Sequence, residues 1–134
     1  MSLNIEKPCI DLGIITRDAE RLLAFYRDLL GLPLEGVIPM PTGGTMHRLK
    51  AGESVIKIVQ LDREPAADAV PGGIPAATGY RYWTMTVSNL EEMVAECQEA
   101  GYNVVVPPKD VRPGVTIAIV ADPDGNWVEF LQNA

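Results

Sequence analysis

Residues 10–26 read IDLGIITRDAERLLAFY, and residues 81–95 read RYWTMTVSNLEEMVA. In each stretch a strand-like run of alternating apolar residues passes into a run with the apolar spacing of a helix. Each half of the chain then closes with another strand-like run, 55–59 in the first half and 127–131 in the second. The offset is 71 residues at the front (82 − 11) and 72 at the back (129 − 57). A nearly constant offset over two kinds of element indicates duplicated supersecondary units.

The expected order of elements is the same in both halves. In the first half, Asp18 caps a helix that Gly31 and Pro33 end. The second half ends in a hairpin whose turn, Asp122–Gly125, has the order of a type I turn. The expected strands are 10–16, 34–38, 45–50 and 54–61, then 80–87, 104–106, 116–121 and 127–132, with the second helix at 89–100. The fold class is therefore α+β with two βαβββ modules.

With 134 residues the chain has the length of one domain. We expect a single domain at 1–134, with module one at 8–61, a linker at 62–78 and module two at 79–134. The linker is rich in Pro, Gly and Ala and shows no periodicity, so a plain linker, a lid and a crossing to a partner all stay open. Lys109 and Arg112 are expected in a solvated, Pro-rich loop.

Charge and composition exclude several classes of partner. The formal net charge is −7 with only 11 Lys and Arg residues, so no basic face for nucleic acid is expected. The first eight residues lack the apolar core of a signal peptide, and no apolar run approaches the roughly 20 residues of a membrane span. We therefore expect a cytoplasmic protein without a membrane partner, in which Cys9 and Cys97 are buried thiols and not a disulfide.

Two stretches, IDLGIITRDAERLLAFYRDLLGL at 10–32 and DPDGNWVEF at 122–130, resemble the vicinal oxygen chelate superfamily. This superfamily includes glyoxalases, extradiol dioxygenases and bleomycin resistance proteins, and the resemblance covers nearly the whole chain. It implies that the two modules form an open, cup-shaped mixed β-sheet with helices on the outer face. It also implies a homodimer and, for an active member, a lyase or isomerase.

By position, the resemblance places the metal ligands of the superfamily on Asp11, Lys57, Tyr82 and Glu129, where only Glu129 keeps the usual residue. Independently, strand alternation puts these four on the parity opposite the apolar residues, so they would face the cup. The resemblance implies a divalent metal of the zinc, nickel or manganese type with Glu129 as a ligand. The residues favour no cofactor, because an ammonium at Lys57 repels a cation. A single histidine also excludes a two-His facial triad within one subunit.

Besides a metal site, two interpretations of this quartet stay open. One is a charge-compensated network around Lys57. The other is a catalytic set for a small polar ligand, in which Lys57 meets a carboxylate or enolate oxygen while Glu129 or Asp11 moves a proton. Four further residues are predicted to contact substrate: Tyr80, Trp127, His47 and Arg48. His47 and Arg48 have opposite parity, so the hairpin register decides which one faces the cup. A histidine at position 47 is more typical of a strand-surface or hydrogen-bonded core position than of a ligand contact.

The sequence thus predicts a glyoxalase-like protein that encloses a small polar metabolite. As an enzyme it would be a lyase or isomerase with an atypical or lost metal site. The alternative is a metal-free protein of the bleomycin-resistance type that binds or sequesters a small molecule, for which the acidic balance would suit a cationic ligand. A structural or regulatory partner protein is the third interpretation.

Overall fold

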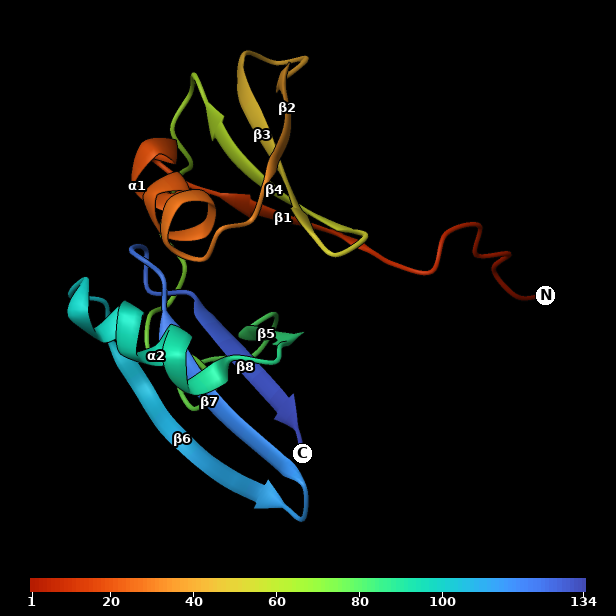
Figure 1. Cartoon of the computed structure of the whole chain (residues 1–134). Helices are drawn as coiled ribbons and strands as arrows, with labels where there is room; N and C mark the ends of the chain where they lie inside the picture. Colours follow the sequence, from red (N-terminus) through yellow and green to blue (C-terminus); the bar gives the residue numbers. More distant parts are fainter. The chain divides into compact units, whose positions relative to one another are not determined.

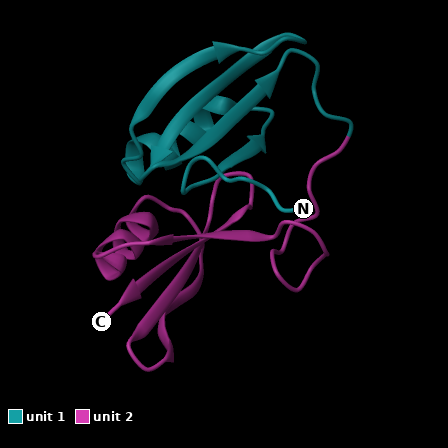
Figure 2. Cartoon of the chain, turned by 90° about the vertical axis from the view of Figure 1, so that its right-hand side faces the viewer, with its two compact units in different colours: residues 1–66 teal, residues 67–134 magenta.

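The structure, a computed structural model, describes residues 1–134 and contains two compact units, Met1–Ala66 and Ala67–Ala134 (Figure 2). Each unit has one four-stranded mixed sheet and one helical segment (Figure 1). The predicted order βαβββ is confirmed in both units, as is the α+β class. The boundary between the units falls inside the segment 62–78 that the sequence marks as a connection.

The first unit has the strand order β1-β4-β3-β2, in which β1 and β4 are parallel and the other neighbours antiparallel. Its parallel pair joins the first strand of the module to the last. The elements are β1 (Asp11–Ile15), α1 (Ala19–Leu23), η1 (Ala24–Leu29), β2 (Leu34–Pro39), β3 (Gly44–Ala51) and β4 (Ser54–Leu61).

The helical segment of the first unit differs from the single α-helix expected. Asp18 caps α1 as predicted, its side chain accepting from the Arg21 amide at 3.3 Å, but the segment continues as the π-helix η1. There the Leu30 amide donates to the Phe25 carbonyl at 2.9 Å. The wider π turn accompanies complete burial of the neighbouring side chains Phe25 and Tyr26, whose rings meet edge to face with centroids 4.8 Å apart.

The second unit repeats the topology with the strand order β5-β8-β7-β6 and a parallel β5–β8 pair. Its elements are β5 (Tyr82–Thr86), α2 (Leu90–Glu99), β6 (Val104–Arg112), β7 (Val115–Ala121) and β8 (Trp127–Asn133). None of the helices in the chain has the length and apolar character needed to span a bilayer.

Strand β6 corrects the expectation of a loop at Lys109 and Arg112, because both residues lie on this strand. Its pairing with β7 is irregular, with register shifts between Val106 and Lys109 around Pro107 and Pro108. As the edge strand it can carry two prolines, since one side of an edge needs no sheet hydrogen bonds. The predicted turn at Asp122–Gly125 is confirmed by the Gly125 amide, which donates to the Asp122 carbonyl at 2.9 Å.

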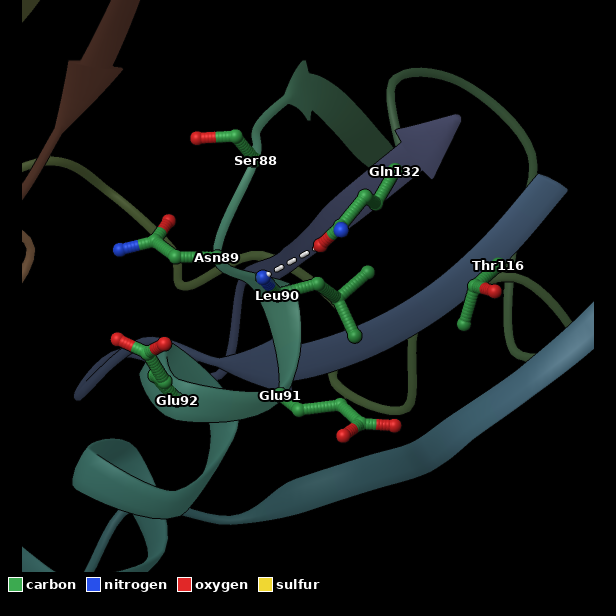
Figure 3. A pocket seen from close by; sticks show the side chains of 7 residues that line it. All are labelled: Ser88, Asn89, Leu90, Glu91, Glu92, Thr116 and Gln132. Atoms are coloured by element: carbon green, nitrogen blue, oxygen red, sulfur yellow. Dashed lines mark hydrogen bonds between the residues drawn. The ribbon is translucent and has the colours of Figure 1, made fainter. Parts of the chain in front are cut away.

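A glutamine on the last strand of each module fixes which face of its sheet meets the helix. Gln60 Oε1 accepts from the Ala19 amide at 2.9 Å, and Gln132 Oε1 accepts from the Leu90 amide at 2.8 Å. Figure 3 shows Gln132 reaching from β8 to the first turn of α2. Because side chains alternate along a strand, Lys57 and Glu129 lie on the opposite, helix-free face of their own sheets. These two faces are called the open faces below.

Candidate functional site

The open face of the first sheet brings Asp11 and Lys57 together. Lys57 lies opposite Gly13 in the parallel β1–β4 register, and its Nζ is 3.4 Å from Asp11 Oδ2. Lys7 Nζ donates to the other oxygen, Oδ1, at 2.7 Å. The ammonium group of Lys7, followed by that of Lys57, holds the pKa of Asp11 below its usual range. Lys7 was missed in the sequence because it precedes β1 in a stretch without periodicity.

The β3–β4 register decides between His47 and Arg48. Arg48 lies opposite Lys57, so it shares the open face, and its Nε donates to Glu35 Oε2 at 3.2 Å. His47 lies opposite Ile58 on the face that meets the helix, and its Nδ1 is buried without a hydrogen-bond partner. The structure therefore brings Arg48, and not His47, beside Lys57.

On the open face of the second sheet, Glu129 pairs with Thr84. The two residues are opposite each other in the parallel β5–β8 register, and Thr84 Oγ1 donates to Glu129 Oε1 at 2.7 Å. Tyr82 lies opposite Trp127 and is half exposed. Thr84 was also missed, although it follows Gly13 by the same 71 residues (84 − 13) that separate Tyr82 from Asp11. The repeat offset together with a parallel register could have identified it.

Trp127 is partly covered by the segment before β5. Gly73 is buried with φ of 63°, and a Cβ at this position would overlap the indole ring of Trp127. Arg81 holds the segment in place, its Nε donating to the Gly73 carbonyl at 2.9 Å and its Nη2 to the Val70 carbonyl at 2.6 Å. One part of the ring is thus in contact with the chain's own backbone, while Tyr80 is fully exposed.

The protein-family model described as Glyoxalase/Bleomycin resistance protein/Dioxygenase superfamily matches residues 10–130 of the chain. The chain belongs to this superfamily. The resemblance carried by residues 10–32 and 122–130 is thereby confirmed. Comparison with curated protein sequences gives no significant match.

Several solved structures with the same fold match almost the whole length of this chain. A glyoxalase family protein from Bacillus cereus is similar at 16% identity with a TM-score of 0.83, over 99% of this chain and 98% of the other. One from Enterococcus faecalis shares 25% identity, with a TM-score of 0.67 and 96% of each chain covered. An antibiotic binding protein from a Streptomyces species shares 21% identity, with a TM-score of 0.67, over 92% and 93%. These likenesses establish the glyoxalase-type fold.

The residues that the resemblance places at ligand positions do not fit a divalent metal. Both oxygens of Asp11 face ammonium groups, and Glu129 Oε1 accepts the Thr84 hydroxyl. A protonated lysine offers no lone pair, so Lys57 replaces a donor with a repelling charge. Neither unit gathers three His, Cys, Asp or Glu side chains in metal-binding geometry. The donor set therefore argues against the zinc, nickel or manganese type of site that the superfamily implies.

A separate hollow of about 230 Å³ lies at the start of α2 (Figure 3). A helix N-terminus attracts anions, but here Gln132 already satisfies the Leu90 amide. Glu91 and Glu92 line the same hollow and would repel an anion. The hollow is thus lined by the residues of the helix cap and offers no additional group for ligand binding.

Proposed function

We propose that this superfamily member binds a small polar molecule and does so without a divalent metal. The observation that carries the proposal is Lys57, which the resemblance places at a metal-ligand position and whose ammonium is 3.4 Å from Asp11. A cation placed there would meet two ammonium groups, those of Lys7 and Lys57, around a single carboxylate. A polar organic ligand can instead use these same groups as hydrogen-bond donors.

A binding role is supported by precedent on the same fold. The Streptomyces relative is described as an antibiotic binding protein. Fold alone does not select a ligand, so the support for this chain comes from its own open faces. The charge-compensated pair of Asp11 and Lys57 is compatible with binding, because both side chains keep about a quarter of their surface exposed, 27% and 28%.

The second candidate is a lyase or isomerase that moves a proton without a metal. The observation in its favour is Glu129, a carboxylate on the open face of the second sheet whose orientation is held by Thr84 at 2.7 Å. A positioned carboxylate is a common general base. A binding protein would return its ligand unchanged, whereas an isomerase would exchange a carbon-bound proton of the ligand with deuterated water.

Elemental analysis of the purified full-length chain tests the metal-free proposal directly. We expect well under one equivalent of zinc, nickel or manganese after incubation with each ion and desalting. Glu129→Ala and the control Glu99→Ala, a change on an exposed helix end, should then have the same low content. One equivalent of metal in the wild type that disappears in Glu129→Ala but persists in Glu99→Ala would overturn the proposal.

The oligomeric state and the cellular location stay predictions. The superfamily resemblance predicts a homodimer, which sedimentation velocity of the purified chain would detect as a species of twice the 14.5 kDa mass. A cytoplasmic location is also part of the proposal, and fractionation of the producing cells tests it.

A further inference from the structure

One row of residues crosses all four strands of the first sheet on its open face. The registers place Gly13 of β1 beside Lys57 of β4, Lys57 opposite Arg48 of β3, and Arg48 opposite Gly36 of β2. Two cations thus stand side by side at the centre of the row, with a glycine at each end. Neighbouring like charges on a sheet destabilise it unless something compensates them.

The glycines leave open space beside the two cations. A Cβ built on Gly13 or on Gly36 meets no atom within 4 Å, and neither residue has a positive φ. The backbone therefore does not require glycine at either position. What the glycines provide is room next to Lys57 and Arg48 on the open face.

Both cations retain donors that the chain itself does not use. Arg48 makes one hydrogen bond, through Nε to Glu35, so its two terminal amino groups remain available. The Lys57–Asp11 separation of 3.4 Å is long for a charge-assisted hydrogen bond, which usually measures 2.7–2.9 Å. The Lys7–Asp11–Lys57 group and the neighbouring Arg48–Glu35 pair together contain three cations and two carboxylates.

Partial burial makes these cations effective binding groups. The side chains of Arg48 and Lys57 are 24% and 28% exposed. On β4, Lys57 stands between Val55 and Val59, which share its parity and are only 2% and 3% exposed. Charges in such partly desolvated surroundings interact more strongly with a ligand than fully hydrated ones.

We propose that the row Gly13–Lys57–Arg48–Gly36 binds the oxyanion group, a carboxylate or a phosphate ester, of a small molecule. The guanidinium of Arg48 offers a planar fork to the oxyanion, Lys57 offers a point charge, and the glycines leave room for the rest of the ligand. This inference rests on the proposed function and adds the chemical class of the ligand. It also runs against the overall charge of −7, which by itself would suit a cationic ligand.

Calorimetric titration of the full chain with two matched pairs of probes tests the proposal. Succinate is compared with succinamide, and glycerol phosphate with glycerol, at equal ionic strength. We expect at least one anion of the two pairs to bind and its neutral counterpart not to bind, and the stronger anion identifies the oxyanion. Arg48→Gln and Lys57→Gln should each weaken that binding about tenfold or more. The control Arg112→Gln, on the exposed end of β6, should leave it unchanged.

Gly13→Val provides a test that removes no charge. A Cβ at Gly13 meets no atom within 4 Å, and a β-branched residue suits a strand, so the variant should unfold at the wild-type temperature yet bind the anion at least tenfold more weakly. Equal binding of anionic and neutral probes, or full binding by both Gln variants, overturns the oxyanion site. If bleomycin, a cationic probe, binds while both anions fail, the oxyanion site is wrong and the metal-free binding function stands. A stoichiometric metal removed by Glu129→Ala instead refutes that function.

Discussion

Replacing Gln132 with Ala should destabilise the second unit more than the equivalent change, Gln60→Ala, destabilises the first. The two glutamines make the same hydrogen bond in the two modules, at 2.8 Å to Leu90 and 2.9 Å to Ala19. The difference lies in the neighbouring cap residue. Asp18 still accepts the Arg21 amide when Gln60 is gone, whereas the residue before α2 makes no side-chain cap hydrogen bond.

The structure sets the size of the two effects. Loss of a helix cap costs about 0.5–2 kcal/mol. Leu90 is 1% exposed and the start of α2 has no second cap, but the adjacent hollow still lets water reach the amide. Gln132→Ala should therefore cost about 1.5 kcal/mol. Gln60→Ala leaves the Ala19 amide without this partner, but Gln60 is exposed and Asp18 still caps the helix at the Arg21 amide, so the loss should be about 0.5 kcal/mol. For a chain of this size about 1.5 kcal/mol lowers Tm by roughly 5 °C.

Urea unfolding followed by far-ultraviolet circular dichroism measures both variants, and hydrogen exchange of the helix amides assigns each loss to its unit. The control Gln98→Ala lies on the exposed side of α2 and should stay within about 0.5 kcal/mol of the wild type. Equal losses for the two cap variants, or a larger loss for Gln60→Ala, would refute the idea that the remaining Asp18 cap limits the loss in the first unit.

Two further predictions concern titratable side chains. In an NMR titration Lys7→Met should raise the lowered pKa of Asp11 more than Lys57→Met does, because Lys7 is the larger cause of the shift. In the wild type, the stabilisation that this carboxylate provides should disappear as the pH falls through its folded-state pKa. Burial, and secondarily Glu96, raises the pKa of Cys97 from 9.0 to about 11, so the favourable contribution of its neutral thiol should be lost between these values as the pH rises. A thiol reagent at neutral pH should accordingly modify half-buried Cys9 and not Cys97, and rapid loss of both thiols in the folded chain would contradict this.

Strand alternation and turn chemistry were sufficient to predict most of the fold. The apolar parity at Ile56 and Ile58 predicts β4, and the Asp-Pro-Asp-Gly order at 122–125 predicts the turn before β8. The π-helix was not predictable, because a hydrogen bond from Leu30 to Phe25 depends on packing and not on local spacing. Strand β6 was missed at Lys109 because adjacent prolines indicate a loop unless the strand is known to be an edge.

The candidate site could be predicted only where the internal sequence repeat and the alternation of side chains along a strand both give a signal. They place Asp11 and Lys57 on one face, and the structure shows them paired. Lys7 precedes the first strand, and Glu35 lies at the register shift between Leu34 and Gly36, so strand parity could not place either of them. The choice of Arg48 over His47 needed the hairpin register. How Asp11 and Lys57 relate to Tyr82 and Glu129 stays a prediction from the sequence repeat.

The pairing of first with last strand in each sheet has a consequence for how such a chain can evolve. Every strand pair within the two sheets joins elements of the same module. A substitution in one module therefore leaves the strand register of its counterpart intact. The duplicated halves can therefore acquire different side chains at equivalent positions while the strand pairing stays the same. The pair is Gly13 with Lys57 in the first module and Thr84 with Glu129 in the second.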